Sequence, residues 1–196
     1  MKFSKFIFNT IAPIYGLFFN SQLKYYKKLI KKQKANFNLL AFNNILDVGC
    51  GTGAFATALT QLGAEVTGVE VAKNMLKVAK KKVKVKEIKC VEGDVLNHLP
   101  FKDNEFSIAI AAFVAHGLKS KDRKIMYDEM KRVSKQYVIF HDYNKKRHLL
   151  TDIIEFLERG DYFNFIKQAK TEMEKHFSEV KVINVDKRAA WYICKI

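Results

Sequence analysis

The sequence is short of cysteine and arginine, and it has no long uninterrupted hydrophobic run. Its three cysteines, Cys50, Cys90 and Cys194, are odd in number and far apart, and no Cys-x-x-Cys pair or His/Cys cluster occurs. This excludes the usual zinc motifs and a disulfide framework, and it is typical of the reducing cytoplasm. No stretch approaches the ~20 apolar residues that a membrane span needs. We therefore predict a cytoplasmic protein without a metal site.

The first twenty residues lack the features of a cleaved signal peptide. An apolar run follows Lys2 and Lys5, which is the order found in a secretion signal. However, Asn9, Thr10 and Pro13 interrupt that run, and no Ala-x-Ala-like cleavage site comes after it. We therefore expect no cleaved signal.

Arginine is scarce among the basic residues, although the formal net charge is +15. Lysine gives a diffuse positive potential, whereas planar, bidentate recognition of phosphate favours arginine. The charge is therefore weak evidence for specific nucleic-acid binding, and we expect none. A polyanionic partner or an anionic membrane surface remains open.

Strands and helices alternate along most of the chain. Periodicity predicts seven strands, at 45–48, 65–69, 88–92, 106–113, 137–140, 180–185 and 191–195. It predicts helices at 53–62, 73–84, 121–133, 148–158 and 161–177, with Ser120 as an N-cap. This order predicts an α/β fold, with a doubly wound, mostly parallel seven-stranded Rossmann-like sheet and a C-terminal antiparallel hairpin.

The amino-terminal segment differs from this pattern. Residues 1–40 look helical with a break near Pro13, and aromatic residues recur there at three- and four-residue steps. We predict a helical lid over 1–41 and a main α/β domain over 42–196, with a helical insertion at 145–177. A membrane-surface helix within residues 1–34 is the alternative, because lysines cluster from Lys24 to Lys34.

A glycine turn organises the chain. Apolar residues flank Asp47, and glycines then follow at alternate positions, Gly49, Gly51 and Gly53, before a helical pattern begins. Glycine allows unusual backbone torsions and close approach of a ligand. Open α/β sheets bind ligands at the carboxyl ends of their strands.

Acidic residues close three consecutive strands of the predicted sheet. Asp47 follows the first, Glu70 the second and Asp94 the third. A carboxylate after the second strand can accept hydrogen bonds from ribose hydroxyls. Asp47 would repel a pyrophosphate but would attract an ammonium or a sulfonium group. The spacing of Gly49, Gly51 and Ala54 also satisfies a looser dinucleotide pattern, so an NAD-binding oxidoreductase-like module stays open.

Four stretches together resemble a known family. They are ILDVGCGTG at 45–53, Glu70 followed by Asn74-Met75-Leu76, Glu92-Gly93-Asp94, and Leu99-Pro100-Phe101. From about residue 42 to 145 the chain resembles the class I S-adenosylmethionine-dependent methyltransferases of the type 11 kind. FNTIAPIY at 8–15 is loosely similar to the lead-in of the ubiquinone/menaquinone-biosynthesis branch.

The resemblance implies S-adenosylmethionine as the cofactor and a methyl transfer as the activity. The glycine turn would hold the methionine part, Glu70 the ribose and Asp94 the adenine edge. The residues implied at the cofactor are Asp47, Gly49, Cys50, Gly51, Gly53, Glu70, Val71, Met75, Gly93, Asp94, Val95, Ala111 and Ala112. Tyr15 could reach the ligand if the first segment folds back.

The acceptor is less defined. The fourth strand ends in Ala-Phe-Val-Ala-His rather than the Asn-Pro-Pro-Tyr of adenine and glutamine N-methyltransferases. This favours a small-molecule or lipophilic acceptor, with an RNA (tRNA or rRNA) methyltransferase or RNA-binding module as the alternative. His116 is our first candidate for a general base and His141 the second, near Asp142 and Tyr143.

Overall fold

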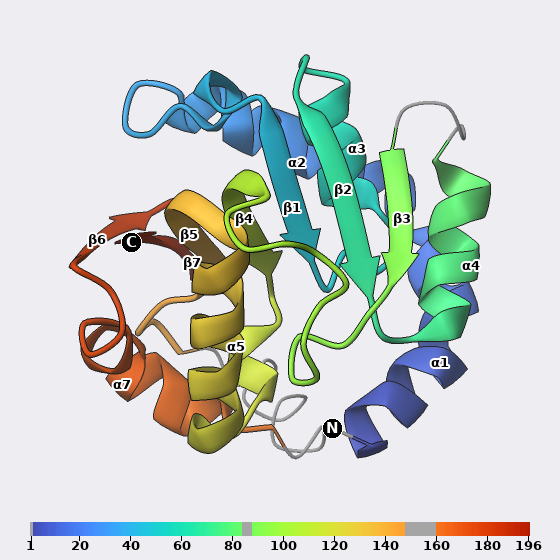
Figure 1. Cartoon of the computed structure of the whole chain (residues 1–196). Helices are drawn as coiled ribbons and strands as arrows, with labels where there is room; N and C mark the ends of the chain where they lie inside the picture. The colour runs from blue at the N-terminus through green and yellow to red at the C-terminus, as the bar shows by residue number, and fades with distance from the viewer. Residues whose placement is uncertain (1, 84–87, 148–159) are drawn as a thin grey trace. The chain divides into compact units, whose positions relative to one another are not determined.

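The computed structural model describes residues 2–83, 88–147 and 160–196. Its seven strands have the order β3-β2-β1-β4-β5-β7-β6 in one sheet (Figure 1). Their bounds are β1 Asn44–Val48, β2 Glu65–Glu70, β3 Ile88–Glu92, β4 Phe106–Ala112, β5 Ser134–Tyr143, β6 Glu179–Asn184 and β7 Ala189–Lys195. The fold predicted from the sequence is confirmed. The chain consists of two compact units, Met1–Pro100 and Phe101–Ile196.

The first unit is a parallel three-stranded layer with helices packed on it. Register places Asp47 of β1 opposite Gly68 of β2, and Glu70 opposite Glu92 of β3. The helices are α1 Lys2–Leu17, α2 Phe19–Gln33, the 3-10 turn η1 Leu39–Ala41, α3 Ala54–Thr60 and α4 Lys73–Lys82. On α4 the apolar side is buried and the lysines are exposed, as expected for an amphipathic surface helix.

Helix α1 continues through Pro13, so the predicted break at that residue is wrong. A proline inside a helix removes the N–H that would bond to the carbonyl four residues earlier. Here that carbonyl belongs to Asn9, and it accepts a hydrogen bond of 3.0 Å from Nδ2 of Asn74 instead. The Asn9 side chain in turn accepts a bond of 2.9 Å from the backbone N–H of Asn74 in α4. A neighbouring helix therefore satisfies the group that the proline leaves open, and the chain turns only at Phe18.

The second unit is a four-stranded layer that changes from parallel to antiparallel. β4 and β5 are parallel, whereas β5–β7 and β6–β7 are antiparallel. Its helices are the 3-10 turn η2 Ala115–Gly117, α5 Ser120–Val133 and α7 Tyr162–Met173. β5 is longer than predicted because β7 pairs with it from Tyr137 to Tyr143 and so supplies backbone partners to its polar end.

Ser120 is not the N-cap of α5. It is the first helical residue, Lys119 occupies the cap position, and Ser120 Oγ donates a hydrogen bond of 3.0 Å to Glu172. The predicted helix at 148–158 lies outside the described residues, as does part of the predicted insertion. Among the described residues, no helix is long and apolar enough to cross a membrane.

Candidate functional site

The turn after β1 has a backbone that only glycine adopts easily. Gly49, Gly51 and Gly53 have φ values of 68°, 55° and 79°. At Gly53 an added Cβ would lie 3.0 Å from Val83, so the Val83 side chain already occupies the space that a larger residue would need. At Gly51 the nearest atom is a backbone oxygen at 4.0 Å. The main chain at Gly51 is therefore open to close approach by a ligand.

Asp47 is a buried acid with an unsatisfied oxygen. Asp47 is 1% exposed, and its Oδ2 has no hydrogen-bond partner within the described part of the chain. Burial raises its pKa to about 7, although a hydrogen bond from the backbone of Ala56 opposes the rise. Buried acids usually have partners, and a cation placed beside this one would restore its charged form.

Glu70, at the end of β2, is tied to the same turn. Its Oε2 accepts a hydrogen bond of 2.9 Å from Gly51 N, and its Oε1 accepts one of 2.7 Å from Ala72 N. Burial raises its pKa, and these two bonds oppose that effect. Each carboxylate oxygen can accept a second bond. Glu70 therefore fixes the turn and still has capacity for a hydroxyl group.

The third acid shapes its own loop. Asp94 Oδ1 and Oδ2 accept hydrogen bonds of 2.9 Å from Leu96 N and from Asn97 Nδ2. Gly93 precedes it, and an added Cβ there would lie 2.7 Å from Val69, so a larger residue cannot fit. Val95 is buried. Asp94 is half-exposed and thus accessible at the end of β3.

Helix α1 covers the start of α4. Ala12, Ala72 and Met75 form one buried cluster, and Phe8 and Tyr15 are among the partly buried residues packed against it. Tyr15 therefore lies near the end of β2. Met75 is 2% exposed and is covered by these neighbours.

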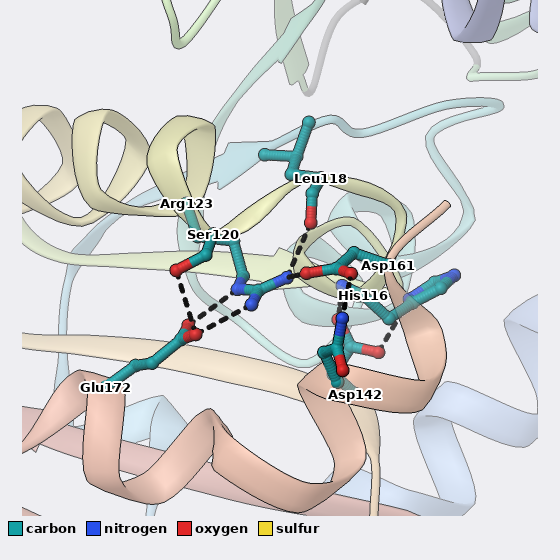
Figure 2. Close-up of polar contacts among 8 residues, drawn as sticks. His116, Leu118, Ser120, Arg123, Asp142, Asp161 and Glu172 are labelled. Atoms are coloured by element: carbon teal, nitrogen blue, oxygen red, sulfur yellow. Dashed lines mark hydrogen bonds and ion pairs between the residues drawn. The ribbon is translucent and has the colours of Figure 1, made fainter. Parts of the chain in front are cut away.

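His116 forms a pair with Asp142 in the second unit. Its Nδ1 lies 2.7 Å from Asp142 Oδ1, and its backbone N–H donates to Oδ2 at 3.3 Å (Figure 2). Tyr143 N donates to Oδ1 at 2.8 Å. In the neutral tautomer whose Nδ1–H donates to Asp142, Nε2 carries the lone pair. Asp142 thus fixes the orientation of the His116 ring.

Aromatic rings surround this pair. Tyr143 meets the His116 ring edge-on at 4.8 Å between centroids, and Phe165 lies at 6.5 Å. Phe113, directly after β4, has φ 55°, which is strained for a side chain of this size. Ala111 and Ala112 end β4 just before it. Strain of this kind concentrates at functional sites.

His141 differs from His116 in its surroundings. It is fully buried within β5, and burial lowers its pKa to about 4. Its ring contacts Phe113 at 4.8 Å between centroids. A neutral, enclosed imidazole is less suited than His116 to meet an acceptor.

Sequence reasoning missed an ion cluster that holds the His116 turn. Arg123 is fully buried and donates to Leu118 O at 2.6 Å, to Asp161 at 2.9 Å and to Glu172 at 2.7 and 2.8 Å (Figure 2). Asp161 N donates to His116 O at 3.1 Å. The cluster thus joins α5, α7 and η2. Its one signal in the sequence is an arginine on the apolar side of a helix.

Sequence reasoning also missed a pair of thiols beside the glycine turn. Cys50 and Cys90 both border Gly68, whose added Cβ would lie 2.9 and 3.8 Å from their sulfur atoms. The Cys50 thiol donates a hydrogen bond that lowers the pKa of Cys90 to about 7, and burial opposes this effect. These residues are 40 positions apart, and nothing local in the sequence indicates the contact.

The chain matches known proteins over its central part. A family model described as a methyltransferase domain matches residues 46–140. A demethylmenaquinone methyltransferase of Staphylococcus haemolyticus is 36% identical over 138 residues, which cover 66% of this chain and 55% of that protein. One from Lactiplantibacillus plantarum is 33% identical over 123 residues, covering 59% and 52%. The chain spans about half the length of these curated relatives.

Solved structures share the fold. A putative S-adenosyl-L-methionine-dependent methyltransferase of Methanococcus maripaludis has a TM-score of 0.71 at 17% identity, covering 95% of this chain and 92% of that one. A SAM-dependent methyltransferase of Aquifex aeolicus has a TM-score of 0.63 at 21% identity, covering 89% and 98%. At these identities the likeness concerns the fold alone. The family match over residues 46–140 agrees with the motifs of that stretch, which resembles the class I S-adenosylmethionine-dependent methyltransferases.

Proposed function

We propose that this chain is an S-adenosylmethionine-dependent methyltransferase that acts on a small, lipophilic acceptor. The observation that carries the proposal is the buried Asp47 oxygen, which has no hydrogen-bond partner among the described residues, at a turn whose backbone is open at Gly51. The match over residues 46–140 supports it. The two relatives named demethylmenaquinone methyltransferase support a quinone-like acceptor ring.

The residues at the turn fit the cofactor. Asp47 offers charge to the ammonium of its amino-acid part, Glu70 offers acceptors to the ribose hydroxyls, and Asp94 offers one to the adenine amino group. When bound, S-adenosylmethionine supplies an electrophilic methyl group on a sulfonium centre. The remaining positions proposed to contact it are Gly49, Cys50, Gly51, Gly53, Val71, Met75, Gly93, Val95, Ala111, Ala112 and Tyr15.

His116 is the proposed general base. Asp142 holds its Nδ1–H, so Nε2 is the nitrogen that can accept a proton from the acceptor. General-base catalysis of this type contributes ~10²–10⁴-fold. Aromatic neighbours such as Tyr143 and Phe165 suit a lipophilic ring. His141 is the second candidate, and its complete burial weighs against it.

Isothermal titration with S-adenosylhomocysteine tests the cofactor. We expect saturable binding to the full chain and a loss of at least ~tenfold in affinity for Glu70→Gln, since a charged acceptor is replaced by a neutral one. Glu92→Gln is the matched control, because Glu92 is exposed on the neighbouring strand. Binding of NAD without binding of S-adenosylhomocysteine would replace the proposal with the dinucleotide alternative.

The acceptor is tested with a demethylated naphthoquinol that carries a short isoprenoid tail. We expect the chain to release S-adenosylhomocysteine in its presence, and much less with the same ring lacking the tail. Turnover with an unmodified tRNA transcript, and none with the quinol, would exclude a lipophilic acceptor.

A further inference from the structure

Three large apolar side chains are exposed together at the corner between α1 and α2. Leu17 is 79% exposed, Ile14 57% and Phe18 56%. Among the described residues, the other exposed large hydrophobics are Ile125 on α5 and Val182 on β6, at 46% and 36%. Those two are single residues on separate elements. The corner, by contrast, is a contiguous patch of the kind that marks an interaction site.

Hydrogen bonds hold the backbone of the corner. Phe18 N donates to Tyr15 O at 3.1 Å, and Ser21 Oγ and Gln22 N donate to Phe18 O at 2.7 and 3.0 Å. Its inner side is packed, because Gly16 lies against Val78 and Phe19 is 4% exposed. The three exposed side chains therefore project from a hydrogen-bonded, packed backbone and not from a frayed helix end.

The charge around the corner has one sign. Residues 1–46 contain eight lysines and no aspartate or glutamate. On α2 the exposed lysines Lys24, Lys28 and Lys31 follow at four- and three-residue steps, which places them on one helix face, and Lys32 lies four residues after Lys28 on the same side. Lysine ammonium groups attract an anionic surface as point charges, without the bidentate geometry of arginine. Apolar anchors beside lysines are the signature of a helix at a lipid interface.

We propose that the corner of Ile14, Leu17 and Phe18, together with the lysine face of α2, docks on an anionic lipid bilayer. The apolar side chains enter the headgroup region and the lysines face the phosphates. Exposed leucine and phenylalanine favour lipid over nucleic acid, since neither side chain binds a phosphate backbone. Helices α1 and α4 lie side by side (Figure 1). Ala12 of α1 packs with Met75 and Ala72, and Ala72 N donates to Glu70. That the docked protein takes a lipophilic acceptor from the bilayer to that region rests on the proposed function. The docking of the corner on the bilayer does not.

Vesicle flotation of the full chain tests the proposal. We compare vesicles of phosphatidylcholine alone with vesicles that contain phosphatidylglycerol. Wild type is expected to bind the anionic vesicles at least ~tenfold more strongly. The triple variant Ile14→Ser, Leu17→Ser, Phe18→Ser is expected to lose at least ~tenfold in partition. Ile125→Ser with Val182→Ser is the matched control and is expected to bind like wild type.

Two further measurements separate the explanations. A variant with Lys24, Lys28 and Lys31 changed to Gln is expected to lose its preference for anionic vesicles. Unchanged binding of the triple serine variant overturns the proposal, and so does a wild type that is a dimer at the assay concentration while that variant is a monomer.

S-adenosylhomocysteine titration of each variant checks folding of the first unit. Vesicle binding by a chain that fails to bind S-adenosylhomocysteine would contradict the proposed function and leave docking intact.

Discussion

The His116–Asp142 pair is the residue-scale feature with the sharpest chemical consequence. Both side chains are buried, and the bond between them is 2.7 Å. We expect His116→Gln to lower kcat by about 100-fold and Asp142→Asn by a similar amount, with the KM for S-adenosylmethionine unchanged. Because the two residues act as one unit, the double variant should be no slower than either single variant.

A second pair provides the control for this prediction. His176 Nδ1 lies 2.9 Å from Asp128 Oδ1 on the surface of the same unit. His176→Gln should therefore leave kcat unchanged. Additive losses in the double variant, or a KM that rises while kcat stays constant, would show that the His116–Asp142 pair serves structure alone.

The thiol pair predicts unusual reactivity at one cysteine. The hydrogen bond from Cys50 lowers the pKa of Cys90 from 9.0 to about 7. Alkylation of Cys90 by iodoacetamide should therefore follow a titration with a midpoint near pH 7, since the thiolate is the reactive form. Cys50→Ala should move the midpoint upward by at least one pH unit. Cys194 should stay unreactive in the folded chain because burial raises its pKa.

At the scale of the elements, the Arg123 cluster joins α5, α7 and the turn that carries His116. Its guanidinium donates to Glu172 through two nitrogens and to the carbonyl of Leu118 through a third bond. Burial alone would raise the pKa of Glu172, but the bonds and charge of Arg123 lower it. Loss of Arg123 or of Glu172 would leave the charge of the other buried without its counter-ion.

Arg123→Met should accordingly lower the free energy of unfolding by about 3–5 kcal/mol. The double variant with Glu172→Met should recover most of that loss, because the less exposed of the two carboxylates that Arg123 contacts is then absent, and only Asp161, whose side chain is 18% exposed, remains. Urea titration followed by the fluorescence of Trp191, which is fully buried, measures both. A double variant as unstable as Arg123→Met would indicate that packing, not charge, is the cause.

At the scale of the whole molecule, Asp47 links stability to pH. Its pKa is about 7 in the folded chain and 3.8 without the fold. Between these values the folded state binds more protons than the unfolded state, so stability falls as pH rises from about 4 to about 7. The full difference corresponds to about 4 kcal/mol, an upper limit because a substituted amide must also be buried.

Asp47→Asn should therefore raise the melting temperature of the ligand-free protein at pH 8 and have little effect near pH 4. The same change should weaken S-adenosylhomocysteine binding, since the carboxylate that we propose to meet the ammonium group is gone. Thermal melts of the wild type and of Asp47→Asn between pH 4 and pH 8 measure the difference in melting temperature. A difference that does not vary with pH would mean that Asp47 has its ordinary pKa in the folded chain.

Much of the fold could be predicted because its signals are local. The strand at Ile88–Glu92 has the predicted bounds, and the turn of Gly49, Gly51 and Gly53 has the positive φ values that make glycine necessary. The family resemblance over the central part is confirmed by the match to residues 46–140. The assigned roles of the site residues remain predictions.

The sequence alone determined the order of the elements, the glycine turn and the placing of acids at strand ends. Each of these depends on backbone torsion and on residues within one or two turns of each other. Only the tertiary structure decided that α1 runs through Pro13, that Asp142 orients His116 and that Cys50 meets Cys90. In each of these three cases the partner lies 26 to 65 positions away along the chain. Such contacts arise from how the elements pack, and no local periodicity encodes them.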